Sequence, residues 1–112
     1  MNKYLGKVSE KALVSSAELV MKNRALYGFL KAKYVNLTSA FCLNILPEQG
    51  EDIYTLLVNG QEILLVELSR VDHSLAEIES LPLDIYLAHL KDPKERKFIL
   101  SALAWVDTEI RL

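Results

Sequence analysis

The chain has 112 residues, a hydrophobic fraction of 51%, a charged fraction of 25% and a formal net charge of −2. This length is typical of a single domain, and the hydrophobic content excludes an intrinsically disordered chain. Cys42 is the only cysteine, which excludes an intramolecular disulfide and a zinc site built from several cysteines. The first eleven residues lack the apolar segment of a secretory signal, and no apolar stretch approaches the length of a membrane span. We therefore expect one cytoplasmic domain over residues 1–112.

Charge is unevenly distributed along the chain. Residues 1–47 carry seven basic and two acidic side chains, residues 48–90 carry one basic and nine acidic ones, and residues 91–112 carry five basic and four acidic ones. Two explanations are open. The basic first segment can lie near the acidic middle segment and offset its charge. Alternatively, two opposite patches face solvent, and one of them steers a charged partner.

The first expected element is a helix that begins at Ser9, whose hydroxyl can cap free backbone N–H groups. Its buried stripe recurs at helical spacing and consists of Leu13, Ala17, Val20, Tyr27 and Tyr34. Gly28 lowers helix propensity, so the helix either ends near Gly28 or continues to Lys33.

A strand follows over Phe41–Leu46, where apolar residues alternate along the chain. Pro47 is expected to end this strand because proline cannot donate to a strand ladder. The polar residues 47–52 then form a turn.

The clearest local signal is a β-hairpin. The runs Ile53–Val58 and Gln61–Leu68 flank Asn59-Gly60, a pair typical of a two-residue type I′ turn. Such a turn would pair Val58 with Gln61, Leu56 with Ile63, and Tyr54 with Leu65. Both faces of this hairpin are then largely apolar, so either helices cover it on both sides or one face contacts another chain.

Three helical segments are expected to close the chain. Ser74–Glu77 has the form of a capping box, Ser80–Asp84 opens a short helix with Pro82 in its first turn, and Asp92–Glu95 combines an N-cap with an N1 proline. The short helix should bury its leucine side, and the last helix a longer stripe. These residues are Leu83, Leu87 and Leu90, with Tyr86 alongside, and then Ile99, Ala102, Leu103, Val106 and Ile110. The predicted fold is thus α+β, a three-stranded antiparallel meander packed by an N-terminal helix and C-terminal helices, in the order α-β-β-β-α-α-α.

Few residues suggest catalysis or metal binding. Asp72-His73-Ser74 has the residue types of a catalytic triad, but three consecutive residues cannot adopt triad geometry. His89 is expected on a helix surface, and Cys42 in a strand is typical of a small buried hydrophobic residue. We therefore expect no catalytic residue, no metal site and no cofactor, although a ligand or enzyme site that uses His73 or His89 is a third hypothesis.

Two basic clusters support an alternative, nucleic-acid-binding function. Lys91, Lys94, Arg96 and Lys97 surround the start of the last helix, where free N–H groups and cations together would bind an anion. In the first helical segment, lysine and arginine lie near aromatic side chains that could stack on bases. These residues are Lys22, Arg24, Lys31 and Lys33 with Tyr27, Phe29 and Tyr34. The same aromatic spacing is also typical of a core-facing helix end.

The leading hypothesis is a small non-enzymatic module that binds one partner protein or associates with itself as a homodimer. The expected contact residues are the acidic turn and one hairpin face: Glu48, Glu51, Asp52, Tyr54, Leu56, Ile63 and Leu65. Acidic side chains would steer a basic partner, and occlusion would be the mechanism. In size, charge and expected architecture the chain is similar to immunity proteins, antitoxins, secretion chaperones and phage-encoded inhibitors, and this similarity fixes no residue.

Overall fold

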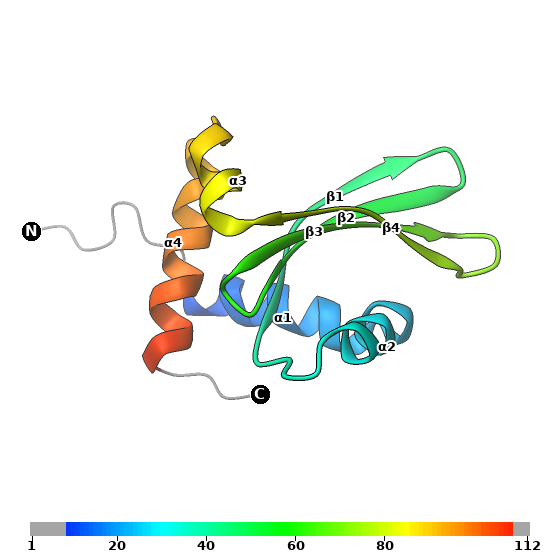
Figure 1. Ribbon diagram of the computed structural model, residues 1–112, viewed down its shortest axis with the longest axis horizontal. Coiled ribbons are helices and arrows are strands. Elements are labelled where there is room, and N and C mark those ends of the chain that lie inside the picture. Colours follow the sequence, from blue (N-terminus) through cyan, green and yellow to red (C-terminus); the bar gives the residue numbers. More distant parts are fainter. Residues whose placement is uncertain (1–8, 109–112) are drawn as a thin grey trace, which may run out of the picture.

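The computed structural model describes residues 9–108 (Figure 1), and the side chains of residues 9–106. The elements in chain order are α1 Glu10–Lys22, α2 Arg24–Lys33, β1 Ala40–Glu48, β2 Glu51–Val58, β3 Glu62–Ser69, β4 Leu75–Pro82, α3 Leu83–His89 and α4 Pro93–Thr108. The strands form one antiparallel sheet in the order β1-β2-β3-β4. The α+β class is therefore confirmed, whereas the three-stranded sheet and the order α-β-β-β-α-α-α are wrong: a second N-terminal helix and a fourth strand are present.

The N-terminal helical segment breaks at Asn23 rather than at Gly28. Ser9 caps α1 as expected, and its Oγ accepts the N–H of Ala12 at 3.2 Å. Asn23 ends α1 with its own N–H donated to the carbonyl of Val20, and it begins α2 because its Oδ1 accepts the N–H of Leu26 at 3.1 Å. One residue thus caps two helix ends, the end of α1 with its backbone N–H and the start of α2 with its side chain, and Gly28 lies within α2.

The fourth strand replaces the helix expected at Ser74–Glu77. The Ser74 hydroxyl donates to Asp72 Oδ1 at 2.7 Å in the β3–β4 turn, so it does not cap a helix. Leu75 pairs with Leu68 and Glu77 pairs with Val66, with a bulge where Ile78 is inserted. Without β4, the buried strand β3 would leave a row of backbone groups unpaired, a cost that outweighs the local helical signal.

Strand β1 runs past Pro47 to Glu48, so the expected polar turn is shorter than residues 47–52. The turn between β1 and β2 consists of Gln49 and Gly50, and Gly50 has a φ of 81°. Pro47 is tolerated because β1 is an edge strand, which needs donors on one side only.

The β2–β3 hairpin has the expected turn but a register shifted by one residue. Asn59 and Gly60 both have positive φ, 57° and 63°, as a type I′ turn requires. Gln61 adds a third residue to the loop, and its carbonyl accepts the N–H of Leu83 at 2.9 Å. Val58 therefore pairs with Glu62 and not with Gln61. A one-residue shift changes which side chains share a face.

The side chain of Asn59 also fastens the loop between α2 and β1. Its Oδ1 accepts the N–H of Thr38 at 2.7 Å, the hydroxyl of Thr38 at 3.0 Å and the N–H of Ser39 at 3.3 Å. Its Nδ2 donates to the carbonyl of Asn36 at 3.0 Å, and its backbone N–H donates to the carbonyl of Ser39. The turn therefore holds a segment about twenty residues away in the sequence.

One face of the sheet packs on α2, and we call it the α2 face. Cross-strand partners project to the same side of a sheet, so Leu56 with Leu64 and Tyr54 with Val66 belong to this face. Leu26 and Leu30 of α2, both fully buried, belong to the same core cluster. Burial of each such leucine contributes about 1.5–3 kcal/mol.

The opposite face packs on the C-terminal helices, and we call it the α4 face. Leu57 pairs with Ile63 here, and both are buried with Ile99 and Ala102 of α4 and with Leu83 of α3. Phe41 of β1 joins them and makes edge-to-face contacts with Phe98 and Trp105, each at a centroid distance of 6.3 Å. The buried side expected for these helices is confirmed where it is described, whereas Ile110 lies outside the described residues.

Helix α1 lies along the free edge of β1. Its residues enter both core clusters, and the hydroxyl of Ser16 donates to the carbonyl of Cys42 at 2.7 Å. The two helical layers are therefore joined at this edge.

A cluster of polar side chains links the end of α2 to strands β3 and β4 on the α2 face. The hydroxyls of Tyr34 and Ser80 both donate to the carboxylate of Glu62, and Lys33 pairs with Glu77 at 2.9 Å. Partial burial raises the pKa of Glu62, but the two hydroxyls and the charge of Lys33 outweigh burial, so the pKa is lowered. The basic N-terminal segment thus offsets part of the acidic middle segment, as one of the two explanations expected.

Candidate partner-binding face of the sheet

The helices cover the two faces of the sheet unequally. In Figure 1, α1 and α2 lie below the sheet, and α3 and α4 stand at its left end. The β1–β2 turn and the β3–β4 turn project to the right. The α4 face is buried near Leu57 and Ile63, close to the Asn59-Gly60 turn. Beyond that point its side chains are exposed or partly exposed, and within residues 9–108 no helix covers them.

An aliphatic strip crosses three strands in this uncovered part. Leu46 of β1 pairs with Ile53 of β2, and Leu65 of β3 pairs with Thr55. Leu46 is 51% exposed, and Ile53 and Leu65 are partly exposed. An aliphatic strip on a sheet is stabilised when another surface covers it.

Four carboxylates surround the aliphatic strip. Glu48 and Glu51 face one another across β1 and β2, Glu67 pairs with Ile53, and Glu79 pairs with Leu65. These pairings place all four carboxylates on the α4 face. The surface formed by Leu46, Ile53, Leu65, Glu48, Glu51, Glu67 and Glu79 is here called the open patch.

Near the four carboxylates, Lys33 and Arg70 are used on the α2 face and in the β3–β4 turn, whereas Lys94 at the start of α4 lies at the other end of the region, beside Leu43 and Asn44. Lys33 pairs with Glu77, whose strand partner Val66 belongs to the α2 face. Arg70 in the β3–β4 turn contacts the carboxylate of Asp52 and donates to the carbonyls of Glu51, at 2.9 Å, and Glu48, at 2.6 Å. Arg70 therefore links the β3–β4 turn to the residues on either side of the β1–β2 turn.

The electrostatics of Glu51 show that the patch is acidic. The carboxyl groups of Glu51 and Glu67 lie within hydrogen-bonding reach, and this contact, together with desolvation and the charge of Glu67, raises the pKa of Glu51. The charge of Arg70 acts in the opposite direction but does not reverse the shift. Two carboxylates held close together favour a proton or an added positive charge between them.

The open patch has a hollow at each end. The outer hollow, of about 420 Å³, is lined by Glu51 and Glu67 with Ser69, Ser74, Leu75 and Ala76. The inner hollow, of about 350 Å³, lies where Leu43 and Asn44 of β1 meet Asp92, Lys94, Glu95 and Phe98 at the start of α4. The patch is therefore a shallow surface rather than an enclosed cavity.

The structure divides the partner-binding residues expected from the sequence into three groups. Glu48, Glu51 and Leu65 belong to the open patch. Asp52 pairs with Arg70 on the α2 face. Tyr54, Leu56 and Ile63 are buried at 7%, 0% and 0% exposure, so the expectation that they form an exposed hairpin face is corrected. The cause is the extra loop residue Gln61, which moves Ile63 and Leu65 to the face opposite Tyr54 and Leu56.

Sequence reasoning missed Leu46, Ile53, Glu67 and Glu79 as members of one surface. Ile53 and Glu67 were on the expected hairpin, but the wrong register separated them. Glu79 was expected between two helices, because the capping-box pattern that begins at Ser74 predicted a helix where β4 lies. The alternation of apolar and acidic residues over Ala76-Glu77-Ile78-Glu79 was the available signal for that strand.

The cations at the start of α4 are not equivalent. Arg96 donates to the carbonyls of Leu87 and Leu90 at 2.7 and 2.8 Å, so it caps the end of α3. Asp92 Oδ1 accepts the N–H of Lys94 at 2.9 Å, as the expected N-cap does. Lys91, Lys94 and Lys97 are exposed. The cluster expected to bind an anion thus offers three lysines beside an aspartate that already occupies the helix start.

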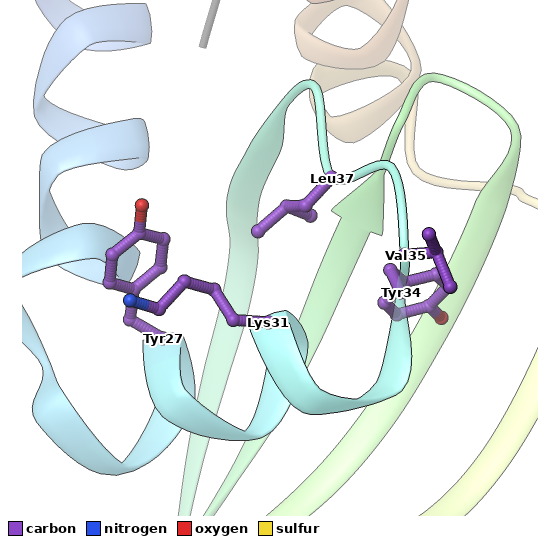
Figure 2. Close-up of a pocket in the computed structure, with 5 residues that line it drawn as sticks. All are labelled: Tyr27, Lys31, Tyr34, Val35 and Leu37. Atoms are coloured by element: carbon purple, nitrogen blue, oxygen red, sulfur yellow. The ribbon is translucent and has the colours of Figure 1, made fainter.

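The aromatic residues of α2 do not form one stacking platform. Figure 2 shows Tyr27 and Lys31 on one side of a pocket, Tyr34 and Val35 on the other, and Leu37 between them; the pocket volume is about 240 Å³. The ammonium of Lys31 lies 4.6 Å from the ring centre of Tyr27. The hydroxyl of Tyr34 donates a hydrogen bond to the carboxylate of Glu62. Phe29 packs against the core of the α2 face. The core-facing explanation therefore holds for Phe29, and Tyr34 is partly buried.

Asp72 and Ser74, two of the residues considered for catalysis, form hydrogen bonds that shape the β3–β4 turn. Asp72 Oδ1 accepts the N–H and the hydroxyl of Ser74, which lowers the pKa of Asp72, and His73 between them has a φ of 62° in an exposed turn. His89 is exposed on α3, and burial raises the pKa of the Cys42 thiol. Among the described side chains, no group of three or more His, Cys, Asp or Glu is arranged to hold a metal ion.

Comparison with known proteins finds no matching family model, no matching curated protein and no matching solved structure. Within residues 9–108, the helices are too short or too polar to cross a bilayer.

Proposed function

We propose that this chain is a small non-enzymatic module that binds one partner protein in the cytoplasm, and that it acts by occlusion, as immunity proteins, antitoxins, inhibitors and chaperones do. The observation that supports this proposal is the open patch, an aliphatic strip on a sheet that the helices of the described chain leave uncovered. Exposed apolar surface surrounded by polar groups is typical of a protein interface.

The surroundings of the patch favour a binding surface over a reaction site. The hollows at its ends are open and shallow, whereas catalytic and ligand sites are usually concave and enclosed. The carboxylates of Glu51 and Glu67 lie close together without a histidine, cysteine or lysine among the residues that line the outer hollow. A surface of this kind supplies contact area and charge.

The test is co-purification of the tagged full chain from its native host, washed first at low and then at high salt, with protein and nucleic acid both identified. We expect one stoichiometric protein partner that forms a 1:1 complex again when the two purified proteins are mixed. The substitution Leu46→Ser should weaken that complex, and Leu100→Ser on α4 is the matched control because the two leucines are 51% and 52% exposed. Recovery of nucleic acid that is lost at high salt, without a protein, would contradict the proposal and favour the lysine clusters.

A further inference from the structure

The uncovered half of the α4 face can be compared with the half of the same sheet that is already covered. On the α2 face, the amphipathic helix α2 presents Leu26 and Leu30 to aliphatic strand residues, and Lys33 pairs with Glu77 at 2.9 Å. The molecule therefore shows what kind of element covers this sheet: a short helix with leucines on one side and basic residues at its margin.

The open patch has the same two components on the opposite side of the sheet. Leu46, Ile53 and Leu65 correspond to the aliphatic residues beneath α2, and the carboxylates of Glu51, Glu67 and Glu79 correspond to that of Glu77. The outer hollow lies between Glu51 and Glu67, where a lysine or arginine side chain would separate two mutually repelling carboxylates. A cation there would gain from both charges.

Charge also decides between a partner and a second copy of the chain. Two open patches brought face to face would place eight carboxylates in one interface, and like charges brought together there are strongly unfavourable. A basic segment removes this repulsion and covers the aliphatic strip at the same time. The same argument excludes an acidic segment.

We propose that the open patch binds a basic amphipathic helix of the partner protein, with its apolar side on Leu46, Ile53 and Leu65 and a lysine or arginine between Glu51 and Glu67. This inference rests on the proposed function, because it names the partner's chemistry and the surface that receives it. It makes the acidic middle segment of the chain a recognition surface as well as a counterweight to the basic α2.

The test uses the ¹⁵N-labelled full chain and two synthetic peptides of equal length. The first is a helical peptide with leucines on one side and lysines on the other, and in the second every lysine is replaced by glutamate. We expect the lysine peptide to shift the amide signals of residues 44–55 and 65–79 and to bind more weakly as salt increases. The glutamate peptide should leave these signals unchanged.

Variants locate the interaction. The double substitution Glu51→Gln with Glu67→Gln should weaken the lysine peptide about five- to tenfold, a modest loss because ion pairs at exposed positions are weak. Glu10→Gln with Glu18→Gln removes the same charge from exposed positions on α1 and should leave the affinity unchanged. Leu46→Ser should weaken binding, and Leu100→Ser should not.

Several results would overturn the inference: shifts concentrated on another surface, equal binding of the glutamate peptide, equal effects of the patch and control variants, or no shift at millimolar peptide. Failure of the proposed function is a separate result. If co-purification yields a partner whose affinity is unchanged by Leu46→Ser and by the Glu51–Glu67 double variant, the binding function stands and the location and chemistry inferred here are wrong.

Discussion

Replacement of Asn59 should show how strongly one turn residue stabilises this fold. Asn59 has a φ of 57°, and its amide makes four hydrogen bonds to residues 36–39. Asn59→Gly keeps the positive φ and the backbone bond to Ser39 but removes all four side-chain bonds. Asn59→Ala removes the same bonds and also places a Cβ in a conformation that favours glycine.

The expected loss follows from these contacts. A hydrogen bond contributes about 0.5–1.5 kcal/mol, but three of the four share the single acceptor Oδ1, and Thr38 is exposed enough for water to replace it. We therefore expect Asn59→Gly to lower the free energy of unfolding by about 1–3 kcal/mol. Asn59→Ala should lower it by about 1 kcal/mol more, because of the backbone strain.

Urea unfolding followed by circular dichroism measures both values, and thermal unfolding checks them, with roughly 4–8 °C lost for each kcal/mol. Thr38→Val is the control: it removes one hydroxyl bond and keeps the backbone contacts, so its effect should stay within about 1 kcal/mol. If Asn59→Gly and Asn59→Ala both fall within about 0.5 kcal/mol of the unmodified chain, the side chain of Asn59 does not hold the loop between α2 and β1 in place.

Three further substitutions test the layers and their polar contacts. Leu56→Ala and Leu57→Ala should each cost about 2–5 kcal/mol in urea unfolding, because these neighbours are buried on opposite faces; a one-sided sheet would give one large and one small loss. The pKa of Glu62 is lowered on folding, so its contribution is present above the unfolded value near 4.5 and is lost as pH falls through the folded value. Glu62→Gln should therefore be less stable at pH 7 and show a smaller decrease in stability below pH 4.5, as unfolding at several pH values would reveal. Arg96→Ala should cost about 1–2 kcal/mol because it removes the guanidinium from the carbonyls of Leu87 and Leu90, and only the Leu87 carbonyl keeps a backbone donor, the N–H of Leu90 at 3.3 Å, whereas Lys97→Ala should stay within about 0.5 kcal/mol; equal losses would contradict the capping role.

The sequence predicted best those elements whose signals were local. The caps at Ser9 and Asp92, the Asn59-Gly60 turn and the buried side of α4 all depend on residues within a few positions of one another. The fourth strand was missed because its formation depends on β3, whose other edge needs partners for its backbone groups. The local capping pattern at Ser74 predicted a helix, but the pairing of residues 75–82 with β3 determines the structure of this segment.

The binding surface was predicted only in part, for a related reason. Which side chains share a face depends on the register, and the register depends on whether Gln61 belongs to the turn or to the strand. Gln61 is taken into the loop because its carbonyl bonds to Leu83, more than twenty residues away, and a pairing rule for short turns does not include such a contact. One residue in a loop thus decided whether Leu65 lies beside Tyr54 or beside Ile53.

The position of α1 along β1 has a consequence for how the sheet can grow. Near Cys42, α1 occupies the edge of β1, and the hydroxyl of Ser16 donates to the carbonyl of Cys42. Near the other end of β1, Pro47 lacks the N–H that an added strand would need as a donor. Within residues 9–108, the edge of β4 is therefore the one that can receive an added strand. Two copies that joined through β4 would form one continuous eight-stranded sheet with a blunted β1 at each end, so edge-to-edge addition would stop at a pair instead of continuing into a filament.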